Sequence, residues 1–154
     1  MSQLVFLLEE RSAQAMLEVF VPRIVPQNIT LRFLSFEGKQ DLEGNILRKI
    51  RGYRVPGARF VVLRDQDSGD CRQAKQRLSS LCIAAGREDA VVRIACRELE
   101  SWYLSDLGAV AAAFDRPHLV READKARFRD PDMLEGPSKV LARISHRPDS
   151  AWRP

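Results

Sequence analysis

Apolar positions along the chain follow two different spacings, one typical of strands and one typical of helices. Four short apolar runs read as strands, at Gln3–Leu8, Ile29–Phe36, Arg59–Leu63 and Ala90–Ala95. Between and after them, apolar residues recur three to four positions apart, which indicates helices beginning near Ser12, Asp41, Asp70 and Glu98. The chain therefore reads as strand and helix in strict alternation.

This alternation, with short connections, predicts an α/β fold. Strands joined through helices pair in parallel with right-handed crossovers, and the helices cover both faces of the sheet. We expect a three-layer α/β/α arrangement around a mostly parallel four-stranded sheet, spanning residues 1–114. Beyond Asp115 the pattern weakens to a less regular helical segment, with one helix candidate at Val140–Ile144. We expect residues 115–154 to form an extension packed on the same domain, and the final residues 150–154 to reflect a truncated chain.

Composition excludes several protein classes. The 154 residues are 45% hydrophobic and 30% charged, which is ordinary for a folded domain and argues against disorder. The apolar runs are too short to cross a bilayer, and the first residues lack a basic signal-peptide region. The three cysteines form no CxxC pair, so a zinc site is not expected. We expect a cytoplasmic protein with no membrane partner.

The net charge of +4 comes from a strong use of arginine. Twenty of the 25 basic residues are arginine, and a guanidinium can bind a phosphate group through two hydrogen bonds. Nucleic acid is therefore a permissible partner. An ordinary solvated surface is the simpler explanation of this modest charge.

Acidic residues follow two of the predicted strands. Glu9 and Glu10 come after the first, and Asp65 and Asp67 come after the third. Ligands of parallel sheets bind beyond the carboxyl ends of the strands, and carboxylate oxygens are the ligands that Mg²⁺ prefers. Because residues i and i+2 of an extended chain point the same way, Asp65 and Asp67 are expected to face one ion. Turn chemistry is the alternative for this pair.

Other charged residues near the strand ends have two interpretations each. Asp70 is expected mainly to cap the following helix, with a metal role as the alternative. Glu98 and Glu100 follow the fourth strand, where each is either a metal ligand or an acid favoured by a helix N-terminus. Lys39, in a loop beyond the second strand, and Lys139, expected to begin the last helix, are either phosphate contacts or ordinary surface lysines.

These residues carry a family resemblance. The segment Leu8-Glu9-Glu10-Arg11-Ser12 resembles the V-E-G-K-S motif of the TOPRIM domain, with Glu10 in place of the usual Gly, and Asp65 and Asp67 stand at its D-x-D. A closer likeness is to a bacterial TOPRIM-like family, domain-of-unknown-function family 4276, related to the TOPRIM domains of overcoming-lysogenization-defect nucleases. Three segments carry this likeness: 36–42, 62–71 and 93–104.

The resemblance implies a magnesium- or manganese-dependent nuclease that acts on DNA or RNA. Glu9, Asp65 and Asp67 would be its catalytic metal ligands, and Glu98 or Glu100 would complete a second ion site. Lys139 would be a further catalytic residue. Lys39 and Arg11 would contact nucleic acid phosphates. The family is also considered a companion of defence-type ATPases, so an ATPase partner is expected.

Two readings compete with the nuclease. A phosphoreceiver also carries acids after its first and third strands, but it needs a lysine after a fifth strand, and no clear fifth strand follows here. The other competitor is a non-catalytic, metal-binding or regulatory subunit of an ATPase complex.

Overall fold

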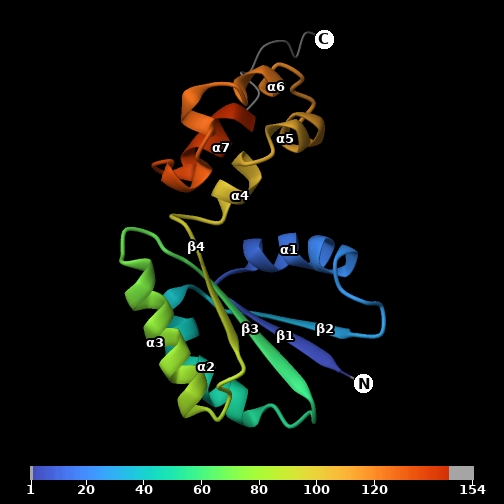
Figure 1. The fold of residues 1–154 in the computed structure, drawn as a ribbon, viewed down its shortest axis with the longest axis vertical. Coiled ribbons are helices and arrows are strands. Elements are labelled where there is room, and N and C mark those ends of the chain that lie inside the picture. Colours follow the sequence, from blue (N-terminus) through green and yellow to red (C-terminus); the bar gives the residue numbers. More distant parts are fainter. Residues whose placement is uncertain (1, 146–154) are drawn as a thin grey trace, which may run out of the picture. The chain divides into compact units, whose positions relative to one another are not determined.

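The computed structural model describes residues 2–145 and contains a four-stranded, all-parallel sheet. Its strands are β1 (Gln3–Leu8), β2 (Thr30–Ser35), β3 (Ala58–Asp65) and β4 (Val91–Ala95). The spatial order is β2-β1-β3-β4, so the first strand and the third lie side by side at the centre (Figure 1). The predicted α/β class and parallel sheet are confirmed, with strand ends shifted by one or two residues.

Helices cover both faces of this sheet, which completes the three layers (Figure 1). One face carries α1 (Arg11–Phe20), and the other carries α2 (Lys39–Gly52) and α3 (Cys71–Ala84). Helix α1 ends just before Pro22, which lies in a 3-10 turn at Val21–Arg23 because proline cannot continue the α-helical hydrogen bonding. Helix α3 begins at an Asp70 cap, whose carboxylate accepts the backbone N–H groups of Arg72 and Gln73.

The main core lies between the sheet and the pair α2 and α3. Alternate strand residues point into it, and the apolar stripes of the two helices close it. Its buried members include Val5, Leu7, Leu42, Ile46, Phe60, Val62 and Leu78. On the other face of the sheet, the rings of Phe6 and Phe33 stack with centroids 4.9 Å apart. The polar residues at the carboxyl ends of β1 and β3 therefore lie at the edge of a well-packed core.

The chain divides into two compact units, Met1–Ala95 and Cys96–Pro154. The described part of the second unit is helical, with α4 (Glu100–Leu104), α5 (Leu107–Ala113), α6 (Leu119–Glu122), 3-10 turns at Ala126–Phe128 and Pro131–Met133, and α7 (Pro137–Ser145). It has its own core around Leu104, Leu107 and Phe128. Residues 96–114, grouped with the sheet on sequence grounds, thus cluster with the C-terminal segment. The expected truncation at 150–154 lies outside the described residues.

The last helix is longer than the Val140–Ile144 pattern indicates. It starts at Pro137, whose fixed φ and missing N–H suit the first turn of a helix. Lys139 is accordingly its third residue rather than its first. Among residues 2–145, every helix is too short or too polar to cross a bilayer.

Candidate metal centre

The carboxyl ends of β1 and β3 meet at the point where the strand order reverses direction. From β1 the chain moves outward to β2 and then returns to the other side of β1 as β3. In open parallel sheets, the crevice beyond such a switch point is the usual place for a ligand. Glu9 directly follows β1, and Asp65 is the last residue of β3.

Glu9 is fixed between its neighbours by both backbone and side chain. Its N–H donates to the Leu63 carbonyl at 3.2 Å, and its carbonyl accepts from the Gly38 N–H at 2.9 Å. Its side-chain Oε2 accepts the backbone N–H of Asp65 at 3.0 Å. The side chain is only 15% exposed. The structure therefore holds this carboxylate against the D-x-D segment.

Glu10 is engaged elsewhere. It is the exposed N-cap residue of α1, and its Oε1 accepts from the Ser12 hydroxyl at 2.6 Å. Of the two adjacent acids, Glu9 is the one that contacts the β3 end. Arg11, expected to contact phosphate, is the exposed first residue of α1.

Burial raises the pKa of Glu9 above its ordinary value, since the charged form of a carboxylate is hydrated less well in a buried site than in water. The nearby negative charges of Asp67 and Glu10 raise this pKa further, while the hydrogen bond from Asp65 and the positive charge of Arg64 lower it. The influence of Asp67 shows that the two acids are electrostatic neighbours. A positive charge near Glu9 therefore stabilises its ionised form.

Replacing Glu9 by Gln is expected to stabilise the metal-free protein at neutral pH. Because the folded-state pKa of Glu9 is raised, the folded state binds the proton more tightly than the unfolded state. The free energy of unfolding therefore falls as pH rises from the ordinary Glu value through the raised one. Glutamine mimics the protonated form and avoids this loss. Urea unfolding in EDTA should show Glu9→Gln as the more stable protein at neutral pH.

At a pH below about 4, where Glu is largely protonated in the unfolded chain, the two proteins should have similar stability. A Glu9→Gln variant that is less stable than wild type at neutral pH would contradict this expectation. It would mean that the ionised carboxylate stabilises the fold.

Asp65 and Asp67 do not present their side chains as an extended D-x-D segment would. Asp65 still pairs with Ala95 in the sheet, but Asp67 lies in a turn with φ of 56°, in the left-handed region. The i, i+2 rule therefore does not apply across them. The Asp67 carboxylate instead pairs with the Lys39 ammonium at 2.9 Å, between side chains 38% and 48% exposed. Lys39 is the first residue of α2, which places it next to this turn.

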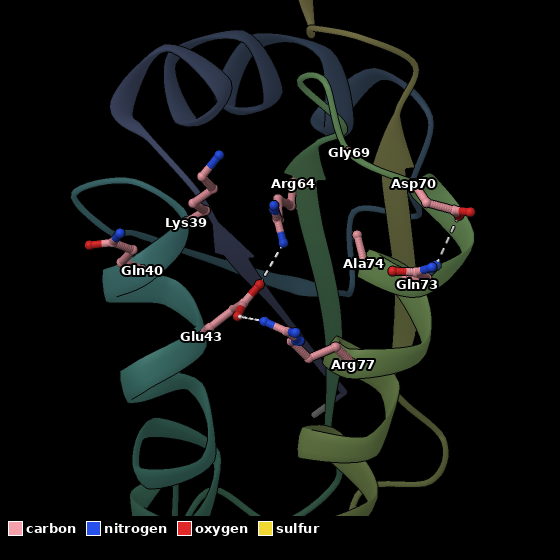
Figure 2. A pocket seen from close by; sticks show the side chains of 9 residues that line it. All are labelled: Lys39, Gln40, Glu43, Arg64, Gly69, Asp70, Gln73, Ala74 and Arg77. Atoms are coloured by element: carbon pink, nitrogen blue, oxygen red, sulfur yellow. Dashed lines mark hydrogen bonds and ion pairs between the residues drawn. The ribbon is translucent and has the colours of Figure 1, made fainter.

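A buried arginine beside the acids is the main feature that the sequence did not reveal. Arg64 precedes Asp65, and its residue is only 9% exposed. One end of its guanidinium bonds Glu43 at 2.5 Å, and its Nε lies 3.8 Å from Glu9 Oε2. Glu43 also pairs with Arg77 at 3.1 Å (Figure 2). The sequence held one signal of this burial. Arg64 follows Phe60 and Val62 at intervals of two residues, so strand alternation places it on the same inward face.

The remaining site candidates belong to the second unit. The Glu98 carboxylate accepts the Ser138 N–H at 2.7 Å, which satisfies one of the open N–H groups at the start of α7. This contact gives Glu98 a capping role. Glu100 is the first residue of α4, and its charge is the lesser of two causes that raise the pKa of Tyr103, after burial. Lys139 lies in the first turn of α7.

The acids that the structure brings together are Glu9, Asp65 and Asp67, by backbone contact and charge. Their carboxylate oxygens are donors that a hard cation such as Mg²⁺ prefers, at the edge of the sheet where ligands of parallel sheets bind. Among residues 2–145, however, no three His, Cys, Asp or Glu side chains are gathered around one point as metal ligands. The Lys39 ammonium is the cation that Asp67 contacts in this arrangement. Comparison with family models, curated proteins and solved structures finds no match to this chain.

Proposed function

We propose that this protein hydrolyses phosphodiester bonds of nucleic acid with Mg²⁺ or Mn²⁺ held by Glu9, Asp65 and Asp67. The observation that carries the proposal is the Glu9 carboxylate fixed 3.0 Å from the backbone of Asp65. This contact lies at the switch point of a parallel sheet, where ligands of such folds bind. The resemblance of the two acidic segments to TOPRIM motifs supports the same reaction.

Asp67 becomes available to a cation when Lys39 releases it. Both side chains are more than a third exposed, and exposed ion pairs contribute only about 0–1 kcal/mol. Exchanging the ammonium for a divalent ion therefore meets little resistance. The released Lys39 would then be free to contact a phosphate oxygen.

Each residue of the proposed site has a different role in catalysis. A divalent ion held by these acids would supply a water of lowered pKa and would offset charge on the attacked phosphate. Glu9 gives a carboxylate whose direction is fixed by the backbone of both central strands. Lys39 would contribute a positive charge beside the negative charge that develops on the phosphate oxygens. Arg64, 3.8 Å from Glu9, favours the ionised form of that ligand.

A cleavage assay tests the proposal. The purified chain is incubated with single- and double-stranded DNA and RNA, in Mg²⁺, in Mn²⁺ and in EDTA. We expect cleavage of at least one substrate with either metal and none in EDTA. Cleavage that continues in EDTA would contradict a metal-dependent reaction, and absence of cleavage with every substrate and metal would contradict the nuclease.

The Lys39–Asp67 ion pair supports the non-catalytic alternative, because the acids among residues 2–145 are not arranged as a preformed metal site. It predicts that Mn²⁺ binds in calorimetry without cleavage of any substrate. It also predicts that a partner ATPase copurifies with the chain and that no cleavage appears when this partner is added.

A further inference from the structure

A pocket of about 360 Å³ lies between α2 and α3, over the end of β3 (Figure 2). Its lining includes three cations, from Lys39, Arg64 and Arg77, and two carboxylates, from Glu43 and Asp70. Glu43 is fully engaged, with one oxygen bonded to each arginine. The Asp70 carboxylate caps α3. The pocket thus has a surplus of positive charge, and its acids already have partners within the fold.

The two arginines retain donors beyond those that bond Glu43. A guanidinium carries five N–H groups in a planar fork, and each arginine contacts Glu43 through its Nη1 atom. The Nε of Arg64 is buried and has no hydrogen-bond partner in residues 2–145. The Arg77 side chain is 70% exposed, so it can turn toward a ligand. Arginine forks of this kind match the oxygen spacing of a phosphate group.

The pocket adjoins the proposed metal centre through two of its cations. Lys39 contacts Asp67, and the Arg64 Nε lies 3.8 Å from Glu9. Helix α2 starts at Lys39, and its N-cap is Gly38, which supplies no side-chain cap. The N–H groups of this first turn add a partial positive charge at the same end of the pocket, which the Asp41 carboxylate in the turn partly offsets. An anion in this pocket would therefore lie beside Glu9 and Asp67.

We propose that this pocket binds a backbone phosphate of the nucleic acid strand that is cut at the neighbouring acids. The identity of the strand rests on the proposed nuclease function, whereas phosphate binding itself needs no cleavage. A phosphate presents enough oxygens to accept from two guanidiniums and an ammonium together. Its arrival draws Lys39 away from Asp67 and frees that carboxylate for the metal. Phosphate binding and metal binding then strengthen each other, as linkage requires.

The test measures binding of a fluorescent single-stranded oligonucleotide in EDTA, at fixed salt, to the full chain. Arg77→Ala is expected to weaken binding about tenfold, since it removes a charged hydrogen bond to the phosphate. The matched control is Arg72→Ala, an exposed arginine of the same helix that does not line the pocket. It should weaken binding about twofold at most, through general charge alone. Circular dichroism verifies that each variant is folded.

Glu43→Gln provides a change of opposite sign. It removes the carboxylate that competes for both guanidiniums, so the oligonucleotide should bind more tightly than to wild type. General charge alone predicts at most about twofold tighter binding, so a gain of that size, no change or a loss would each overturn the proposal. Equal weakening by Arg77→Ala and Arg72→Ala would overturn it as well, because surface charge would then explain the binding.

Two further measurements separate the source of the phosphate and the link to cleavage. Inorganic phosphate and adenosine monophosphate are titrated into wild type and Arg77→Ala. If Arg77 matters for the mononucleotide and not for the oligonucleotide, the pocket is a mononucleotide site and the strand proposal fails. Arg77-dependent strand binding in EDTA, without cleavage in Mg²⁺, contradicts the nuclease and supports the pocket. If Arg77→Ala leaves both cleavage and strand binding unchanged, the result supports the nuclease and contradicts the pocket.

Discussion

Asp65→Asn should lower the rate of metal-dependent cleavage by about 10³-fold, an effect of the size seen when one charge-stabilising group of an active site is lost. Asparagine keeps the shape of the side chain and the sheet pairing with Ala95 but removes the negative charge that would hold the ion. The measurement is the single-turnover rate at saturating Mg²⁺, together with Mn²⁺ affinity by calorimetry. The affinity should fall with the rate, because both depend on the same ligand.

The matched control is Glu10→Gln, next to Glu9 at the end of β1. Glu10 is exposed, it does not line the pocket, and its side chain bonds Ser12, so the variant should cleave within about twofold of wild type. It loses the same charge close to the same site, and it therefore reports any effect of charge alone. Equal activity of Asp65→Asn, Glu10→Gln and wild type would remove Asp65 from the centre. Equal loss in both variants would indicate a general electrostatic effect.

Phe60→Ala should lower the free energy of unfolding by about 3–5 kcal/mol, the usual cost of deleting a buried ring. Phe60 is 1% exposed in the central strand β3. Its ring meets the Tyr53 ring edge-on with centroids 5.6 Å apart, and the Arg87 guanidinium lies 5.0 Å from its centroid. Truncation leaves a cavity that this close-packed region cannot fill.

The control is Phe20→Ala at the end of α1. That ring is 47% exposed, so its loss should cost about 1 kcal/mol or less. Urea unfolding is followed by far-ultraviolet circular dichroism, because both tryptophans of the chain, Trp102 and Trp152, belong to the second unit. Similar losses for the two variants would mean that the sheet core adapts to the missing ring.

The fold was predictable because the apolar pattern determines it locally. Four apolar runs alternating with helical stretches allow few arrangements other than a parallel sheet with helices on both faces. That topology also explains why Glu9 and the end of β3 meet, although 56 residues separate Glu9 from Asp65. In the sheet unit only the ends of elements differed, whereas residues 96–114 clustered with the C-terminal segment instead of the sheet.

Details of the site depended on backbone and contacts that no local pattern encodes. The left-handed conformation of Asp67 breaks the alternation on which its expected direction rested. Arg64 follows the apolar run of β3, and its burial is offset by Glu43, a residue of helix α2. Glu98 contacts the start of α7 across 40 residues, so its role as a cap depends on how the second unit folds.

The central place of β1 has a consequence for how the first unit folds. Strand β1 pairs with β2 along one edge, where Gln3 lies beside Thr30, and with β3 along the other, where Gln3 lies beside Ala58. The earliest strand of this unit therefore cannot complete its hydrogen bonding until β3 has been synthesised. Pairing across so many residues carries a large loop-closure entropy, which slows folding. During synthesis, one edge of β1 and the Glu9 carboxylate therefore have no hydrogen-bond partner from β3 until that strand has emerged.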